Sequence, residues 1–437
     1  MLVAAVPPPK PGLFFFTIYI CMRMKFFLPV FLFLLVSFLS NAEIIRVPGS
    51  ESIRHALLKA KDGDVLIITG GLRNESEIVV DKSVWIVGEN FPEINGNGAG
   101  NIFVIKSPDV LIRGFVLQNC GYSSIHEFAA IQIQNDSEVV ISNNFLKNNF
   151  FGIYIANSRR CTITNNQISS NAEAEATSGN GIHLWKSVDC IIEGNQVHQH
   201  RDGIYFEFVK NSVITKNSSS GNLRYGLHFM FSDNNHYSHN RFFENGSGVA
   251  VMYSKNVVMR KNRFDHNWGD AAYGLLLKEI SGSVIEQNIF GQNTTAIDME
   301  GTSKCRMSEN QFLENGWAFK LLGDCTDDTL TKNNFLKNTF DISTNSERNA
   351  NFILANYWDH YAGYDLDRNG TGDVPYQPVS LYGKMIEQTP AMLMLMHSFF
   401  IDILDQTEKM IPTLVPLAYS DFSPCMKPIQ IITGRHD

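Results

Sequence analysis

The sequence lacks a block of basic residues. Its 36 Lys and Arg are outnumbered by 44 Asp and Glu, and the formal net charge is −8. A nucleic-acid-binding protein normally carries a clustered basic patch. The sequence also lacks a Ser/His/Asp arrangement, a phosphate-binding glycine loop and the thiolate spacing of a zinc site. We therefore expect no nucleic-acid partner and no catalytic centre of these kinds.

Cysteine is scarce, with seven in 437 residues. Cys21 would be lost with an export signal, and the other six show no obvious pairing. Cys161 and Cys190 each stand five residues before a repeated asparagine, which puts them in one column on adjacent turns about 5 Å apart. We interpret them as small buried residues, with a disulfide as the alternative in an oxidising compartment.

Residues 1–42 have the composition of an export signal. A lysine precedes the apolar run at 26–39, and the small residues at 40–42 suit signal-peptidase cleavage. A second apolar stretch at 13–20 indicates either that translation starts at a later methionine or that the chain keeps a membrane anchor. In both cases we expect the body to be exported and periplasmic.

A unit close to 22 residues repeats through the middle of the chain, and each copy carries an asparagine at the same place. These anchors are Asn143, Asn166, Asn195, Asn217, Asn240, Asn262, Asn288, Asn310 and Asn333. Three residues before each anchor comes a residue that we place in one inward column: Val140, Ile163, Ile192, Ile214, Tyr237, Met259, Ile285, Met307 and Leu330.

Self-similarity at this period is typical of a solenoid. The apolar segments are short, β-branched and alternating, so they indicate strands rather than helices. The sequence therefore predicts an all-β fold, a right-handed parallel β-helix over about residues 65–345. In such a stack, asparagines in one column can hydrogen-bond to the turns above and below, as polar ladders do in other stacked β structures.

The two ends differ from the repeat. Residues 50–61 predict a short helix, capped by Ser50, that would hide the open end of the core. Insertions at 172–178 and 268–272 predict loops on one face. We divide the chain into a signal region at 1–42, a β-helix domain at 43–389 and a helical docking tail at 390–437.

One outward column carries soft metal ligands. His228 and Met230 share a turn, Met252 lies beside Met230 on the next turn, and Glu207 lies on its other side. Met and His suit Cu(I), and turns about 5 Å apart allow two flexible thioethers to reach one ion. The alternative is that the C-terminal segment covers this stripe and the methionines are adaptable packing.

A second pattern alternates oxygen ligands around Gly370. It resembles the first half of a calcium loop but lacks the closing glutamate, so the later carboxylate would have to complete the shell. The candidate ligands are Asp365, Asp367, Asn369, Thr371 (through its carbonyl) and Asp373. An Asx-rich turn without a metal is the alternative.

The tail after Pro390 is apolar and has a helical pattern. It is too short, and too interrupted by Asp402 and Asp405, to span a bilayer. It could cap the rod, lie on a membrane surface or dock on a membrane partner. The docking candidates are Met392, Met394, Met396, Phe399 and Phe400.

Many parallel β-helices cleave or epimerise acidic polysaccharides, so a secreted lyase or epimerase is the alternative function. Such an enzyme needs clustered carboxylates and a base. Here the charged residues are scattered over the outward columns, and Lys278 beside Glu300 is as consistent with a cross-strand ion pair as with a base.

Five segments resemble the NosD family: 223–235 (LRYGLHFMFSDNN), 248–255 (GVAVMYSK), 271–278 (AAYGLLLK), 315–318 (NGWA) and 356–359 (NYWD). The resemblance extends over nearly the whole mature chain. It implies a non-catalytic periplasmic accessory protein for copper-site maturation of nitrous oxide reductase. It also implies partners, namely an ABC transporter permease with its ATPase, through which the chain would meet the membrane, and a copper chaperone. It implies no defined ligand set.

Overall fold

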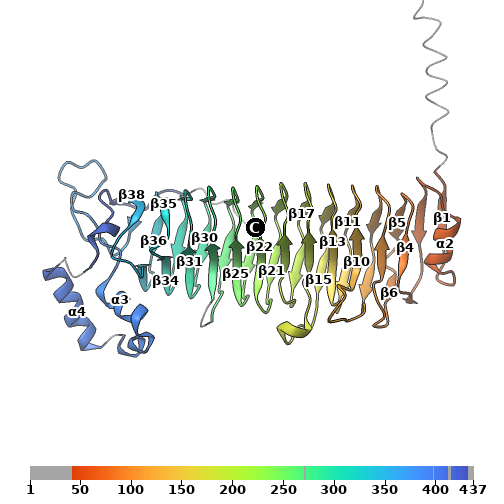
Figure 1. Ribbon diagram of the computed structural model, residues 1–437, viewed down its shortest axis with the longest axis horizontal. Coiled ribbons are helices and arrows are strands. Elements are labelled where there is room, and N and C mark those ends of the chain that lie inside the picture. The colour runs from red at the N-terminus through yellow and green to blue at the C-terminus, as the bar shows by residue number, and fades with distance from the viewer. Residues whose placement is uncertain (1–41, 270–271, 397, 412–414, 432–437) are drawn as a thin grey trace, which may run out of the picture.

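The protein is a long rod of parallel strands in a computed structural model that describes residues 42–269, 272–396, 398–411 and 415–431 (Figure 1). Three parallel sheets of 14, 12 and 13 strands, here sheets A, C and B, run along it. The predicted parallel β-helix is thus confirmed. The export signal, apart from Ala42, lies outside the described residues.

Sheet A contains β1 (Ile44–Val47), β2 (Val65–Ile68), β5 (Trp85–Gly88), β8 (Leu111–Arg113), β11 (Val140–Ser142), β14 (Thr162–Thr164), β17 (Ile191–Glu193), β20 (Val213–Thr215), β23 (His236–Ser238), β26 (Val258–Arg260), β29 (Val284–Glu286), β32 (Arg306–Ser308), β35 (Thr326–Thr331) and β38 (Ala350–Leu354). Sheet B contains β3 (Arg73–Asn74), β6 (Glu93–Asn95), β9 (Val116–Gln118), β12 (Phe145–Lys147), β15 (Gln167–Ser169), β18 (Gln196–His198), β21 (Ser218–Ser220), β24 (Arg241–Phe243), β27 (Arg263–Asp265), β30 (Ile289–Gly291), β33 (Gln311–Leu313), β36 (Asn334–Leu336) and β39 (Tyr357–Trp358). Sheet C contains β4 (Ile78–Val80), β7 (Phe103–Ile105), β10 (Ala129–Gln134), β13 (Phe151–Ala156), β16 (Ile182–Trp185), β19 (Ile204–Glu207), β22 (Tyr225–Met230), β25 (Ser247–Met252), β28 (Tyr273–Lys278), β31 (Thr295–Glu300), β34 (Trp317–Leu321) and β37 (Phe340–Ser343).

The repeated asparagines form a buried ladder between sheets A and B. Asn240 is fully buried, and its Oδ1 accepts hydrogen bonds from the backbone N and Nδ2 of Asn217 at 2.9 and 3.0 Å. Its Nδ2 donates to the Ile214 carbonyl at 2.9 Å and to Asn262 Oδ1 at 3.0 Å. The asparagine side chain therefore pairs backbone groups of the preceding turn and links to the asparagine side chain of the next turn.

The first predicted anchor is wrong by one residue. Asn144, rather than Asn143, donates to Asn166 Oδ1, and Ile141, rather than Val140, pairs with Ile163 in the inward column. Asn143 occupies the left-handed turn position before the ladder, at φ 54°. Asparagine favours that conformation as well as the ladder, so adjacent asparagines give two acceptable registers in the sequence. The rest of the inward column is buried as predicted.

A second asparagine ladder, which the sequence reasoning missed, runs between sheets B and C. Its members are Asn222, Asn245, Asn267, Asn293, Asn315 and Asn338. Beside it, phenyl rings stack along the core, with centroids 4.6 Å apart for Phe264 and Phe290 and 4.0 Å apart for Phe335 and Trp358. Over these turns, therefore, two asparagine ladders hold two corners of the rod, and aromatic rings fill its interior.

Helix α2 (Ile53–Lys59) closes the N-terminal end, as predicted, and buries Ile53, Ala56 and Leu57 in the core. The helix begins after Ser52, not after Ser50, and the Ser52 hydroxyl bonds to Glu75 rather than to the helix. The rod also starts earlier than predicted, because β1 precedes α2 and pairs with β2.

The chain after the last strand leaves the rod and then returns to it. Helix α3 (Leu381–Gln388), the 3-10 turn Pro390–Leu395 and helix α4 (Phe399–Met410) lie beside the end of sheet C, and a 3-10 turn at Leu417–Tyr419 follows (Figure 1). Of the helices in the described ranges, none has the length and apolar composition to cross a bilayer.

Asp421 ends the first asparagine ladder. It is fully buried and accepts hydrogen bonds from the backbone N of Ala355 (3.0 Å), from that of Asn356 (2.9 Å) and from Trp358 Nε1 (3.0 Å). The proposed boundary at residue 389 falls between α3 and α4, which pack against each other, and the segment 415–431 beyond it packs into the last turn.

The described cysteines are all free. Cys161 and Cys190 are buried neighbours in sheet A, each hydrogen-bonded to a nearby backbone carbonyl. The interpretation as small buried residues is confirmed, and the disulfide alternative is not observed among the residues described.

Replacing a ladder asparagine should strongly destabilise the rod. We expect Asn240→Ala to lower the free energy of unfolding by about 2–4 kcal/mol, because it removes the acceptor of the buried Asn217 backbone N–H and the side-chain donor to the Ile214 carbonyl. Asn171→Ala, at an exposed position, is the matched control and should have little effect. Urea denaturation measures both. Equal stability of the two variants would show that the ladder adds little.

Candidate functional site

The outer face of sheet C carries the candidate copper ligands in the predicted register. Tyr205 pairs with His228, His228 with Ala250, and Met230 with Met252. His228 and Met230 are two residues apart on β22, so they face the same side. The structure thus brings His228, Met230 and Met252 onto one patch, with both methionines half-buried.

His228 is deeply enclosed rather than freely exposed. Only 5% of its surface is accessible, and its ring lies 4.8 Å, between centroids, from each of Tyr205 and Tyr225. Its Nδ1 lies 3.7 Å from Asp202 Oδ2, and neither buried ring nitrogen has a hydrogen-bond partner within the described part of the chain. The hydrogen-bonding capacity of the ring is thus unused, although solvent does not reach it.

Asp202 organises the charges behind this ring. It is fully buried and binds Arg224 through two hydrogen bonds of 3.0 and 2.5 Å. Burial opposes ionisation of Asp202, but the neighbouring His228 ring and the hydrogen bonds from Arg224 outweigh it and lower the pKa of Asp202 to about 2. The carboxylate is therefore charged and fixes the orientation of His228.

Two more buried histidines were missed as candidates: His183 lies in the same column of sheet C as His228, and His200 lies at the neighbouring corner of the rod. Burial lowers the pKa of His183 and of His200 to about 3, so both are neutral at physiological pH. His200 replaces an asparagine in the second ladder, and its backbone N donates to Asn222 Oδ1. The sequence signal that could have identified His200 is that it stands where the following turns carry an asparagine. Neutral imidazole is the form that binds metals.

The insertion at 172–178 lies next to this wall. Its Ala176 and Ser178 line a cavity of about 250 Å³ together with His183 and Arg201. The insertion projects from the rod near β15 (Figure 1). It therefore lies beside one end of the histidine column, and the prediction that the insertion forms a loop is confirmed.

An exposed aromatic ladder borders the methionines. Phe208, Phe231 and Tyr253 directly follow Glu207, Met230 and Met252, and their stacked rings have centroids 5.2 and 5.1 Å apart. Each is more than 40% exposed and has a left-handed backbone, at φ 56°, 51° and 52°. Bulky residues rarely adopt this conformation. The sequence reasoning missed this surface, although the aromatics recur at one offset.

Farther along sheet C the charged groups pair with one another. Lys278 Nζ lies 2.8 and 2.9 Å from the two carboxylate oxygens of Glu300. Hydrogen bonding to Glu300 raises the pKa of Lys278, which makes this lysine a poorer base. Burial raises the pKa of Asp298 to about 6. The geometry matches the cross-strand ion pair considered from the sequence.

The candidate calcium loop is an exposed, self-bonded turn. Asp365 accepts hydrogen bonds from the backbone N of Asn369 (3.1 Å) and Gly370 (2.9 Å), and Asp373 accepts one from Leu366 (2.7 Å). Asn369 Oδ1 accepts the Thr371 N–H at 2.7 Å. Within the described ranges, the three loop aspartates do not all bring a carboxylate oxygen within 4.8 Å of one another.

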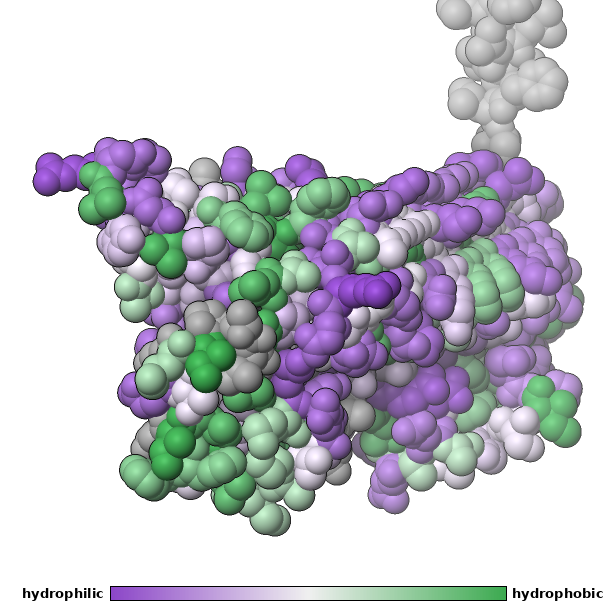
Figure 2. Space-filling model, turned by 60° about the vertical axis from the view of Figure 1, so that its left-hand side comes forward, coloured by the Kyte–Doolittle hydropathy of each residue, from purple (hydrophilic) through white to green (hydrophobic). Residues whose placement is uncertain are grey.

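The docking candidates divide into two groups. Met392 and Met396 pack against the apolar cluster of Trp317, Phe340, Tyr382, Ile386 and Ile401. Met394, Phe399 and Phe400 are 90%, 78% and 43% exposed. Figure 2 shows apolar side chains gathered over this helical end, at its lower left. The first group attaches the excursion to the rod, and the second leaves a large apolar surface.

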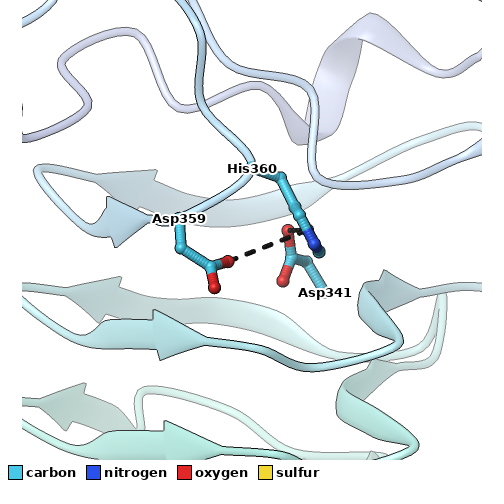
Figure 3. A group of neighbouring side chains, drawn as sticks. All are labelled: Asp341, Asp359 and His360. Atoms are coloured by element: carbon cyan, nitrogen blue, oxygen red, sulfur yellow. Dashed lines mark hydrogen bonds and ion pairs between the residues drawn. The ribbon is translucent and has the colours of Figure 1, made fainter.

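A charged cluster that the sequence reasoning missed lies at the same end of the rod. Asp341, Asp359 and His360 point toward one another (Figure 3), and one ligand atom of each lies within 4.8 Å of the others. No repeated spacing marks these residues. The available signal was that Asp341 interrupts a column of glycine and alanine.

Comparisons with known families agree with the fold and the NosD resemblance. A family model described as "Periplasmic copper-binding protein (NosD)" matches residues 168–365. A second, described as "Right handed beta helix region", matches residues 92–197.

Two curated relatives carry the name "Probable ABC transporter binding protein NosD". The one from Pseudomonas aeruginosa is 27% identical over 385 residues, which is 84% of this chain and 89% of that protein. The one from Stutzerimonas stutzeri is 25% identical over 373 residues, covering 81% and 85%. Among solved structures, the Dettilon tailspike protein matches with a TM-score of 0.53 at 11% identity over 70% of each chain. That last similarity concerns the fold alone.

Proposed function

This chain is a NosD-type protein, and we propose that it is a periplasmic accessory in copper-site maturation of nitrous oxide reductase, working with an ABC transporter and a copper chaperone. The observation that carries the proposal is the His228, Met230 and Met252 patch on sheet C. The description of the family as copper-binding supports copper as the cargo, and the names of the relatives support the transporter as a partner.

The patch suits a transient Cu(I) site. It offers two thioethers and one imidazole, which are soft ligands. The methionines are half-buried, so an ion held there would remain accessible to a partner. A delivery protein has to release its ion, so a partly open site with two or three ligands serves better than a closed four-ligand cage. Glu207, which pairs with Met230, adds a negative charge that attracts a cation.

The neighbouring aromatic ladder supports protein docking at the same place. Exposed Phe and Tyr rings are typical of interface anchors. A copper chaperone that binds Phe208, Phe231 and Tyr253 would bring its metal beside Met230 and Met252. We therefore assign the chaperone to this face of the rod.

Removing both thioethers should weaken Cu(I) binding without unfolding the rod. Met230→Leu/Met252→Leu roughly keeps side-chain volume, so we expect native stability and Cu(I) affinity lowered by about tenfold or more. Anaerobic titration with a competing Cu(I) chelator measures the affinity. Met259→Leu/Met307→Leu, which changes two core methionines, is the matched control. If the first variant binds Cu(I) and supports reductase maturation as the parent does, Met230 and Met252 serve only in packing.

The transporter would bind the helical end. Met394 and Phe399 form an apolar surface that is exposed to solvent. Exposed apolar patches are typical of interaction sites. Docking by this surface gives the membrane contact through a partner. Because residues 415–431 complete the last turn, truncation after Thr389 would damage the rod, and surface substitutions are the sharper test.

We expect Met394→Ser/Phe399→Ser to fold normally but to lose association with the transporter, because the exposed apolar contact is removed. Co-purification with the permease and ATPase in nanodiscs measures this. Leu58→Ser/Leu72→Ser, which removes exposed apolar residues at the other end, is the control. If the tail variant assembles as well as this control does, the docking assignment is refuted.

We also propose that the 365–373 loop binds calcium. Its backbone is held to the C-terminal segment by Gly372 N to Pro424 O (2.8 Å) and Met426 N to Gly370 O (3.0 Å). Its carboxylates lie around the left-handed Gly370. A bound calcium ion would replace the backbone N–H groups that now donate hydrogen bonds to these carboxylates.

Calcium should then stabilise the parent, by about 2.7 kcal/mol at a hundredfold excess over the Kd. Asp367→Ala should lose this gain because it removes an oxygen ligand. Thermal melts in calcium and in chelator measure the difference, with exposed Asp81→Ala as the control. If the parent melts at the same temperature in both buffers, the loop is an Asx-rich turn that binds no calcium.

No catalysis is part of this proposal. The lysine that could act as a base in a lyase or epimerase is committed to Glu300, which favours its protonated form. Turnover of an acidic polysaccharide by the purified protein would favour the enzymatic alternative instead.

A further inference from the structure

The last turn of sheet C carries a carboxylate where earlier turns have room only for glycine or alanine. The column, in strand register, is Gly203, Gly226, Gly248, Gly274, Ala296, Ala318 and Asp341. A Cβ at Gly248 would meet the Gly274 carbonyl oxygen at 2.4 Å. Asp341 fits because β37 ends the sheet within the described strands. Its side chain is nonetheless buried, at 4% exposure.

Two further ligand groups converge on Asp341. His360 Nδ1 lies 3.3 Å from Asp341 Oδ2 and 3.9 Å from Asp359 Oδ1 (Figure 3). Asp359 and His360 directly follow β39, so sheets B and C both contribute to the cluster. The His360 side chain is 51% exposed, which gives an ion access from solvent.

The hydrogen bonds of the cluster leave two buried oxygens without partners. Tyr376 donates to Asp341 Oδ2 at 2.6 Å, and His360 lies beside the same oxygen. Asp341 Oδ1 and Asp359 Oδ1 are buried and have no hydrogen-bond partner in the ranges described. An unpaired buried carboxylate oxygen is unfavourable, and an ion pair with His360 alone does not satisfy it. Asp341 and His360 also line a cavity of about 640 Å³.

We propose that Asp341, Asp359 and His360 bind a divalent first-row transition ion, with Zn(II) as the probe. Bonds of about 2.0–2.2 Å to nitrogen and oxygen place neighbouring tetrahedral ligands about 3.3–3.6 Å apart. The ligand atoms are already near that separation. One imidazole with two carboxylates suits a harder ion than the Cu(I) preferred by thioethers. The Tyr376 hydroxyl orients the Asp341 carboxylate from the second coordination shell.

Such an ion would fasten the C-terminal segment to the rod. Tyr376 exchanges backbone hydrogen bonds of 2.9 Å with Asp421, the residue that ends the asparagine ladder. The cavity beside the cluster is also lined by Glu408 of α4, whose carboxylate accepts the Leu381 N–H at the start of α3. The ion therefore links the last turn, the ladder cap and the helices that carry the apolar surface. This role is independent of copper on sheet C.

The test is Zn(II) titration of the chelator-treated mature protein by calorimetry, with the metal content of the dialysed complex measured separately. We expect one equivalent to bind, and His360→Ala to bind it about tenfold or more weakly because a direct ligand is lost. Asp359→Asn is an independent second variant. His198→Ala, which alters an exposed histidine on β18, is the matched control and should bind as the parent does. Circular dichroism of each variant checks its fold.

Co(II) provides a direct readout of the ligands. Its visible spectrum should show an imidazole and carboxylate environment in the parent, in His198→Ala and in Met230→Leu/Met252→Leu, and should lose it in His360→Ala. Absence of Zn(II) binding by the parent would overturn the proposal. So would unchanged affinity and stoichiometry in a folded His360→Ala.

Discussion

The buried asparagine ladder is the interaction on which the rest of the molecule depends. Each side chain accepts hydrogen bonds from one turn and donates to backbone carbonyls and to the next asparagine, as Asn240 does between Asn217 and Asn262. The geometry allows no variation in chain length inside the corner. Extra residues must leave the rod as loops, which is where the insertion at 172–178 lies.

Because the strand register is fixed, side chains at the same position in successive turns form columns on the outer wall. Because side chains alternate along a strand, a slip of one residue would exchange inner and outer faces. The alternation of Tyr154, His183, Tyr205 and His228 along sheet C depends on this constraint, with ring centroids 5.0, 4.7 and 4.8 Å apart. The same register puts Met230 beside Met252. Function on this wall therefore needs no cleft, only residues that recur at one offset.

The sequence was sufficient for features that repeat and insufficient for features that occur once. Period and alternation predicted the β-helix, the inward column and the pairing of Met230 with Met252. They failed at Asn143, where two adjacent asparagines fit two turn positions. They also missed the enclosure of His228 by Asp202 and Tyr225, because side-chain burial on an outward column depends on neighbouring turns and loops.

The sequence also could not predict single contacts between residues that are far apart in the chain. Asp421 binds Asn356, 65 residues earlier, and nothing in the local sequence marks it as a ladder cap. Asp341 and His360 meet only because the chain turns back at the end of the rod. Their one local signal is negative, since a carboxylate stands where six preceding turns carry glycine or alanine. Exceptions to a repeat are informative because the repeat defines what would fit.

Termination of the ladder also fixes the place of the apolar surface that we propose as a docking site. Without Asp421, the backbone N–H of Asn356 would be unpaired and its side-chain amide would lose one acceptor, and a buried unpaired donor is unfavourable. Asp421 satisfies these groups, so the chain has to come back to the rod after residue 411. Helices α3 and α4 are consequently tethered at both ends, by β37 and β39 before them and by Asp421 after them. The exposed apolar residues of this excursion are thereby held in a fixed place at the end of a rigid rod, which limits the entropy lost when a partner binds them.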